Sequence, residues 1–518
     1  MKTFGFKKPT RKHYNFKHML NISPVFLVML IFSFSFFCMI NRVSSVLGSV
    51  TQLSELKDNL KDMAIMVFPT DKKMSESLIS LRSIIESHEQ GKNIFQSNEA
   101  DIYYLIKYFQ SKLDDVESLE SLIQKFAGKD FSIGLNKYKP FLETFGEMLN
   151  YKDDLFSLLG KDGQQKYMVV LQNTGEKRPN GGFFGSFALL TLNGTKFDVE
   201  VIDSYKLLYL NPSAKVQTPS WASDIVPDSN FGFISSNKFG FTDMDGKNLK
   251  EIYEEVYPDQ KIRGVIFVKS DYFEEIIPGF TEKLYEWQFV NASVDLIRGE
   301  DIINKKEIYL TEVNQFLQNQ KIQILKNMIE KFTLLGDENH INAYFTDISD
   351  DFQKFLYSKG YINLYDTNKA YFWDKNIGFN KIDRFVKKTI FVEDELGNLI
   401  IDEFGDIIDV QKLTPGKYNF KVVYDLNIPQ SYIDLLNSLS EKYDIELTDR
   451  EDVILGLRVY WDNEGMIYLP PNFKVSKVVG SPYEHKIFQT TFSSNLKFAI
   501  KSTRNNVMRY VQFDVEVE

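Results

Sequence analysis

The spacing of hydrophobic and polar residues changes twice along the chain, and each change marks a different kind of structure. In residues 44–160, leucine, isoleucine and methionine recur every three or four positions with charged residues between them, which predicts amphipathic helices. Breaks at Pro69, Gly91, Gly128 and Pro140 favour several antiparallel helices over one rod. We interpret this segment as a helical stalk whose apolar stripe is either a local bundle core or a coiled-coil partner surface.

Near residue 164 the period shortens to that of strands. Four β-rich stretches follow, at 167–172, 186–192, 197–202 and 264–269. Helical patterns at 251–256 and 302–335 lie between and after them. Strands alternating with helices predict a mixed α/β domain over residues 164–384.

From residue 385 to the end, short strand patterns are separated by polar turns such as 394–398 and 462–465. This spacing predicts a β-sandwich over residues 385–518. The fold class is therefore expected to be α+β with several domains: a helical stalk, a central α/β domain and a C-terminal sandwich.

The first 42 residues add a membrane segment to this picture. Residues 22–40 are almost wholly apolar, and these nineteen residues in a helix would span about 28 Å, the thickness of a hydrocarbon core. Six cations precede the segment, which predicts a basic cytoplasmic tail at 1–21, a single transmembrane helix at 22–41 and an extracytoplasmic bulk. The alternative is a cleaved signal peptide, although no clear cleavage site follows.

Charge and cysteine content narrow the function classes. The formal net charge is −10, but residues 1–42 hold seven basic residues and no acid, which leaves the remainder at about −17. Such an acidic surface argues against nucleic acid as a partner. The one cysteine, Cys38, falls within the predicted span, so structural disulfides and thiol chemistry are not expected outside the membrane.

A polar loop between the strands at 167–172 and 186–192 is the best candidate site. It places Arg178 beside the pair Gly181-Gly182, a combination that suits an anion because glycine lets a ligand approach the backbone closely. Two structural alternatives remain open. Arg178 can form an ion pair with Glu176 or Asp203, and the glycines can serve a tight turn or bulge.

Four stretches of the chain resemble one bacterial family. They read QNTGEKRPNGGFFGSF from residue 172, DSYKL from 203, RGVIFVKSDYF from 263 and DKNIGFNKIDRFV from 374. Together they resemble the motifs of the family called domain of unknown function 4012. That resemblance implies an uncharacterised membrane-anchored extracytoplasmic protein with no settled activity.

A more remote resemblance is to the LytR–CpsA–Psr family, which moves glycopolymers from a polyprenyl-pyrophosphate carrier to the cell wall. It implies Arg178 as a clamp for the pyrophosphate and Asp203 as a base or as the ligand of Mg²⁺. Ile202 or Asp203 takes the place of that family's arginine. The substrate-binding residues suggested for this site are Glu176, Asn180, Gly181, Gly182, Asn376, Lys381 and Arg384. A capped turn is the structural alternative for the stretch around Asn376 and Lys381.

Two functions follow from these observations. The first is an envelope protein that binds or transfers a polyprenyl-pyrophosphate-linked glycopolymer, with polyprenyl phosphate or cell-surface glycan as its partner. The second is a non-catalytic surface scaffold or adhesion protein. The sequence leaves open whether the chain is an enzyme, because no zinc site, Ser-His-Asp triad or P-loop pattern is present.

Overall fold

The computed structural model describes somewhat more than half of the chain. The described residues are 72–110, 143, 146–193, 196–204, 207, 211, 213–218, 230–277, 279, 282–283, 285–286, 341–362, 364, 366, 368–376, 383–443, 461–482, 484–489, 494–502 and 507–518. The chain divides into two compact units, one of residues 1–165 with 191–198 and one of residues 166–190 with 199–518. The predicted tail and transmembrane segment, residues 1–41, and the helix expected at 302–335 lie outside the described residues.

Apart from the strand residues at 191–193 and 196–198, the described part of the first unit is mainly helical, as its hydrophobic spacing predicts. Its elements are α5 (Lys72–Glu89), α6 (Ile94–Ser97), α7 (Glu99–Gln110), the 3₁₀ helix η3 (Leu149–Tyr151) and α10 (Lys152–Leu158). Helices α5 and α7 pack together, and Leu81, Ile84 and Leu105 are buried between them and their neighbours. Asn93 caps α6 because its side chain accepts hydrogen bonds from the backbone N–H groups of Phe95 and Gln96.

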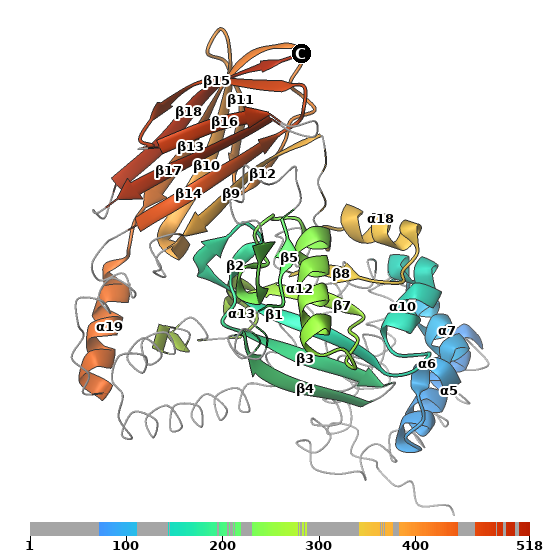
Figure 1. Ribbon diagram of the computed structural model, residues 1–518. Coiled ribbons are helices and arrows are strands. Elements are labelled where there is room, and N and C mark those ends of the chain that lie inside the picture. Colours follow the sequence, from blue (N-terminus) through green and yellow to red (C-terminus); the bar gives the residue numbers. More distant parts are fainter. Residues whose placement is uncertain are drawn as a thin grey trace, which may run out of the picture. The chain divides into compact units, whose positions relative to one another are not determined.

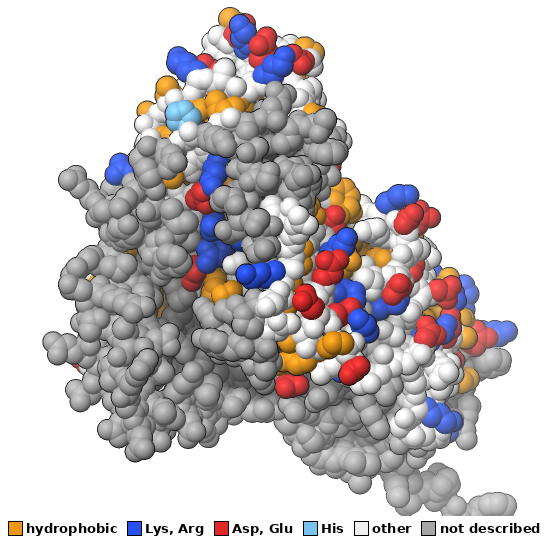
Figure 2. All heavy atoms as spheres, viewed as in Figure 1, with side chains coloured by type: hydrophobic (Ala, Val, Ile, Leu, Met, Phe, Trp, Pro, Cys, Tyr) orange, Lys and Arg blue, Asp and Glu red, His pale blue; other side chains and the backbone are white. Residues whose placement is uncertain are grey.

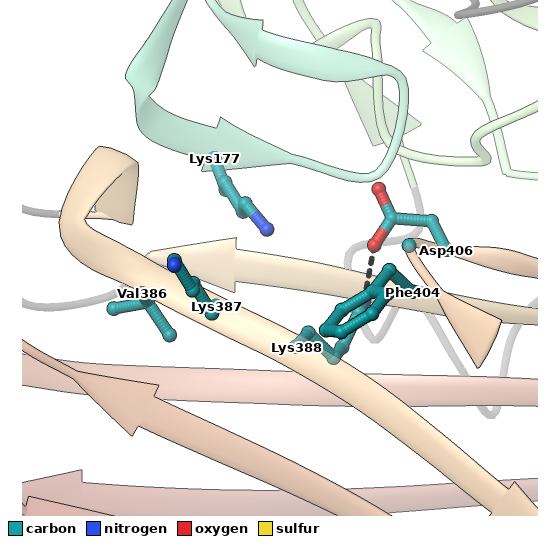
Figure 3. A pocket seen from close by; sticks show the side chains of 7 residues that line it. Lys177, Val386, Lys387, Lys388, Phe404 and Asp406 are labelled. Atoms are coloured by element: carbon teal, nitrogen blue, oxygen red, sulfur yellow. Dashed lines mark ion pairs between the residues drawn. The ribbon is translucent and has the colours of Figure 1, made fainter. Parts of the chain in front are cut away.

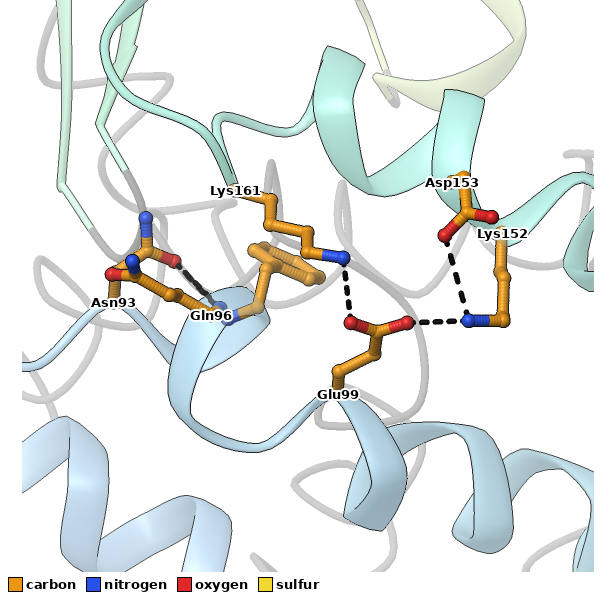
Figure 4. Close-up of polar contacts among 7 residues, drawn as sticks. Asn93, Gln96, Glu99, Lys152, Asp153 and Lys161 are labelled. Atoms are coloured by element: carbon orange, nitrogen blue, oxygen red, sulfur yellow. Dashed lines mark hydrogen bonds and ion pairs between the residues drawn. The ribbon is translucent and has the colours of Figure 1, made fainter.

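A carboxylate links the start of α7 to α10 and the residues that follow it. Both Lys152 Nζ and Lys161 Nζ lie 2.6 Å from an oxygen of Glu99, one lysine on each oxygen (Figure 4). These two hydrogen bonds lower the pKa of Glu99, because each stabilises the ionised carboxylate.

The second unit contains a mixed sheet in the order β4-β3-β1-β7-β8, with β2 added to β1 (Figure 1). Its strands are β1 (Gln165–Arg178), β2 (Gly181–Phe183), β3 (Ser186–Asn193), β4 (Lys196–Asp203), β7 (Gly264–Lys269) and β8 (Ile341–Phe345). Strand β1 runs parallel to β7, and β8 runs antiparallel to β7. Helix α12 (Thr242–Val256) packs against β7 and β8 through its buried apolar face, which includes Leu249 and Ile252.

Short elements complete this part of the second unit. They are β5 (Val216–Gln217), β6 (Asn230–Phe231), the 3₁₀ helix η5 (Phe233–Ser235), α13 (Ser270–Ile276) and α18 (Asp350–Ser358). Phe233 of η5 packs edge-on against Phe184 and tilts over Phe187, which places the β5–β6 segment over the same core as α12.

Two antiparallel five-stranded sheets form the C-terminal part of the chain. The first has the order β11-β10-β13-β18-β15 and the second β12-β9-β14-β17-β16. Their strands are β9 (Lys369–Asn376), β10 (Val386–Asp394), β11 (Leu399–Phe404), β12 (Ile407–Asp409), β13 (Gly416–Leu426), β14 (Trp461–Leu469), β15 (Phe473–Gly480), β16 (Glu484–Gln489), β17 (Ser494–Ser502) and β18 (Val507–Val517). Buried residues from both sheets, such as Phe372, Ile390 and Phe513, form one hydrophobic cluster, which is the arrangement of a sandwich. Helix α19 (Gln430–Tyr443) adds Tyr432 and Leu436 to that cluster.

The sandwich starts earlier in the sequence than the boundary at residue 385. Strand β9 pairs with β14 from Tyr371 to Asn376 and with β12, so the second sheet already includes Lys369. The physical reason is the alternation Ala370, Phe372, Asp374, which points one face of β9 into the sandwich core.

The described surface carries both signs of charge. On the face seen in Figure 2, acidic and basic side chains are interspersed over the described residues. Among the helices that the structure describes, none is long and apolar enough to cross a membrane.

Candidate functional site

The loop predicted after residue 172 is a β-hairpin. Strand β1 continues to Arg178, turns at Pro179 and Asn180, and returns as β2 with Arg178 opposite Gly181. The register shifts between Asn173 and Lys177, which is a bulge in β1. The charged residues of the motif therefore belong to a strand, and strand geometry determines which of them share a face.

The two glycines are needed by the backbone of this hairpin. Gly181 has φ of 89°, a conformation that residues with a side chain rarely adopt. A Cβ on Gly182 would lie 2.2 Å from the carbonyl oxygen of Asn173 on the facing strand. The structural alternative, in which the two glycines serve a tight turn or bulge, therefore describes the positions of Gly181 and Gly182 in the hairpin.

Arg178 contacts a carboxylate of its own strand. Its Nη2 lies 3.1 Å from Glu176 Oε1, and its guanidinium carbon lies 5.4 Å from the ring centroid of Phe183. Both charged side chains are largely covered, at 14% exposure for Arg178 and 10% for Glu176. Residues 176 and 178 are two apart on a strand and so project from the same face, which is why they pair.

Buried polar groups fasten the hairpin to the α/β core. The side-chain amide of Gln172 donates to the carbonyl of Asn180, and Asn237 Nδ2 donates to the carbonyl of Gly182 at 2.8 Å. Both Asn180 and Asn237 are buried. These hydrogen bonds replace water at the turn, so the hairpin is held in one geometry.

Asp245 holds the neighbouring segment in place. Its two oxygens accept hydrogen bonds from the backbone N–H groups of Phe239 and Gly240, at 3.1 and 3.0 Å. Burial raises the pKa of Asp245 well above its ordinary value because the ionised form loses its hydration.

Arg384 is the second predicted cation that the structure places. It lies in the 3₁₀ helix η6 (Asp383–Phe385), with its Nη1 3.5 Å from Glu274 Oε1 and its guanidinium 4.8 Å from the ring centroid of Tyr285. A Cβ on Gly175 would lie 3.0 Å from Arg384 Nε. Arg384 therefore packs against the motif strand, and its role in substrate binding stays a prediction.

The remaining predicted residues are only partly placed. Asp203 is the last residue of β4, and Asn376 is the last residue of β9, paired in register with Asn463. The side chains of Asp203 and Asn376 are not among those described, and Lys381 lies outside the described residues. Their roles in binding, and Mg²⁺ binding at Asp203, stay predictions. Within the described residues, no three acidic, histidine or cysteine side chains gather as a metal site.

A buried charged cluster beside the hairpin was not predicted. Lys388 of β10 forms ion pairs with Asp374 of β9 and with Asp406, and its Nζ lies 2.6 Å from Asp374 Oδ2. Lys177 of the motif strand lies 3.9 Å from the same Asp374 oxygen, and its backbone N–H donates to Asp383 at 2.8 Å. The alternation of residues along β10 was a sequence signal for this cluster. Lys388 occupies the same inward-facing register as Val386 and Ile390, which indicates a buried charge.

Burial and the neighbouring charges shift the pKa values of the residues in this cluster. Burial alone would lower the pKa of Lys177, but Asp406 and Asp374 raise it overall. Burial lowers the pKa of Lys269, at the end of β7. Burial alone would raise the pKa of Asp406, but Lys388, Lys177 and Lys269 lower it overall. The carboxylate of Asp406 is therefore ionised among several cations.

Comparison with known proteins supports one of the two resemblances. Residues 162–281 match the model of a family described as "Protein of unknown function (DUF4012)". The matched segment contains the hairpin with Glu176, Arg178 and the two glycines. No curated protein and no solved structure matches the chain. The first resemblance is thereby confirmed, while that to the LytR–CpsA–Psr family stays a prediction.

Proposed function

Since residues 162–281 are a DUF4012 region, we propose that the chain is a membrane-anchored cell-envelope protein that binds a polyprenyl-pyrophosphate-linked glycopolymer without transferring it. The anchor is residues 22–41, preceded by the basic tail, and the bulk of the chain is extracytoplasmic. Protease treatment of intact cells tests this topology, since an extracytoplasmic bulk is cleaved from outside. Protection of the whole chain until lysis contradicts it.

The ion pair of Arg178 with Glu176 is the observation that favours binding over transfer. Phosphoryl transfer needs cations directed at the phosphate oxygens and a carboxylate that holds the metal. Here the guanidinium contacts a carboxylate two residues away and an aromatic ring. An arginine held in this way stabilises the hairpin, and its Coulomb attraction for a phosphate is reduced by the nearby negative charge.

A transfer assay separates the two activities. The full-length protein is placed in proteoliposomes with a labelled polyprenyl-pyrophosphate glycopolymer, with and without Mg²⁺. We expect the label to co-sediment with the protein and to remain on the polyprenyl carrier. Mg²⁺-dependent release of polyprenyl phosphate that is abolished by Arg178→Ala would contradict the proposal and establish a transferase.

A scaffold or adhesion role is the second candidate, and one feature of the sandwich favours it. The turn between β10 and β11 exposes Leu396 at 87%, and the edge strand β11 exposes Leu399 at 53%. An edge strand with exposed apolar side chains suits pairing with another surface. If this is the function, the wild-type protein does not bind the glycopolymer. The double variant Leu396→Ser/Leu399→Ser then loses surface attachment.

A further inference from the structure

A pocket lies where the motif hairpin meets the first sheet of the sandwich. Its volume is about 420 Å³, and its charged lining consists of Lys177, Lys387, Lys388 and Asp406, with Phe404 at one side. Figure 3 shows Lys177 extending from the hairpin toward the strand that carries Lys387 and Lys388, with Asp406 across from it. Three lysines and one aspartate give the lining an excess of positive charge.

The nearby buried carboxylate of Asp374 offsets part of this positive charge, but its oxygens are already engaged by other donors. Its Oδ1 accepts hydrogen bonds from Tyr424 and Asn463, both at 2.9 Å, and its Oδ2 accepts from Lys388 at 2.6 Å. The ammonium of Lys177 is 3.9 Å from Oδ2, beyond hydrogen-bond distance. Among the residues that the structure describes, none accepts a hydrogen bond from the Lys177 ammonium, so its donors face a ligand in the pocket.

Lys387 and Phe404 supply the accessible part of the pocket. Lys387 lies on the exposed face of β10, next in sequence to the buried Lys388. The ring of Phe404, at the end of β11, is 77% exposed. A single exposed phenylalanine needs no explanation by itself, but beside a cationic pocket it offers an apolar surface next to an anion site.

We infer that this pocket binds a phosphate or diphosphate ester whose organic group has an apolar face. The phosphate oxygens accept hydrogen bonds from Lys177 and Lys387, and the organic group packs on Phe404. The chemistry fits a sugar phosphate as well as a lipid phosphate. The inference depends on the proposed function in one respect only, because that function identifies the polyprenyl carrier as the source of the phosphate.

Calorimetric titration of the full-length protein in detergent distinguishes these sources. The probes are inorganic pyrophosphate, glucose 1-phosphate and farnesyl pyrophosphate. We expect all three to bind, with weaker binding at higher salt, because the interaction is between exposed or half-exposed charges. If the lipid is the source, farnesyl pyrophosphate binds tightest, and if a sugar is the source, glucose 1-phosphate does.

Matched variants locate the binding. Lys387→Ala should weaken every probe by about tenfold, the loss expected for one charge-assisted hydrogen bond. Asp406→Asn should tighten every probe, because it removes the one carboxylate of the lining. Phe404→Ala should weaken the two organic probes by about fivefold and leave pyrophosphate unchanged. Lys417→Ala, which alters an exposed residue of the same sandwich, is the control and should bind as the wild type does.

The outcomes separate this inference from the proposed function. Equal affinity of wild type, Lys387→Ala and Asp406→Asn, or no binding of any probe, overturns the site. If these variants also bind a polyprenyl-pyrophosphate glycopolymer normally, the proposed function stands without the pocket. If the small phosphates bind with the expected variant pattern but the glycopolymer does not, the pocket stands and the proposed function fails.

Discussion

The ammonium of Lys388 lies 2.6 Å from Asp374 Oδ2, and the two side chains, at 2% and 3% exposure, belong to the two facing sheets of the sandwich. The ion pair therefore joins the sheets from inside the core. Tyr424 and Asn463 complete the hydrogen bonds of Asp374. A buried charge pair is tolerated only when its remaining donors and acceptors are satisfied in this way.

Removing one partner of this pair should destabilise the sandwich strongly. Lys388→Met removes the ammonium that donates to Asp374 and leaves only Lys177, at 3.9 Å, as a counter-charge. We therefore expect a loss of about 3–5 kcal/mol in the free energy of unfolding, measured by urea denaturation. The matched control is Lys387→Met, an exposed neighbour on the same strand, which should change stability by no more than about 0.5 kcal/mol. Equal effects of the two substitutions would show that the buried pair is absent.

The hairpin should not accept a side chain at Gly182. In Gly182→Ala the new Cβ would lie 2.2 Å from the Asn173 carbonyl oxygen, so the two strands must separate. We expect a loss of about 1–3 kcal/mol, seen as a lower melting temperature. Gly185→Ala is the control, since its Cβ would meet the nearest atom at 3.6 Å, an ordinary contact distance. A melting temperature of Gly182→Ala equal to that of the control would refute the strand register.

Arg178 and Glu176 should depend on each other for their contribution to stability. Arg178→Ala or Glu176→Gln alone removes one partner of a largely covered pair, at an expected cost of about 1.5–3 kcal/mol. The double variant should cost little more than either single one, which gives a coupling energy of about 1–3 kcal/mol in a double-mutant cycle. Additive losses would mean that the two residues contribute to stability separately.

Glu99 should make the packing of α7 against α10 sensitive to acid. Hydrogen bonds from Lys152 and Lys161 lower the pKa of Glu99 in the folded state, so its stabilisation is present above the unfolded pKa near 4.5 and is lost as the pH falls through the folded pKa. The contribution is about 0.5–1 kcal/mol at neutral pH because the group is partly exposed.

Hydrogen exchange of the α7 and α10 amides measures this effect. Glu99→Gln should exchange faster than the wild type at pH 7, and the difference should shrink as the pH falls below about 4.5. Asp162→Asn, which alters an exposed carboxylate of the same unit, should leave exchange unchanged at both pH values. A difference for Glu99→Gln that persists at low pH would exclude the ion pairs as its cause.

Regular spacing made much of the fold predictable. The inward register of Ile390 and Val392 in β10, and of Phe420 and Val422 in β13, is visible as strict alternation and leads directly to buried strands. The motif hairpin was misread as a loop because β1 ends in charged residues, which usually mark loops. Burial of Glu176 and partial burial of Lys177 and Arg178 reverse that preference, and burial depends on partners that are distant in sequence.

The candidate site was predictable only in part for the same reason. Glu176 as the partner of Arg178 is a local relationship, two residues apart on a strand, and it was one of the alternatives drawn from the sequence. Contacts of Lys177 with Asp383 and Asp374 join positions about 200 residues apart. One sequence gives no information on such pairs, although the inward register of Lys388 was an available sign of a buried charge.

Native mass spectrometry of the detergent-extracted full-length protein tests the proposed function most directly. The protein is incubated with Mg²⁺ and a polyprenyl-pyrophosphate-linked glycopolymer before measurement, beside Arg178→Ala. The account predicts a complex with the intact ligand in both proteins. Loss of the complex in Arg178→Ala would contradict this account. Release of polyprenyl phosphate by the wild type, but not by Arg178→Ala, would contradict it as well.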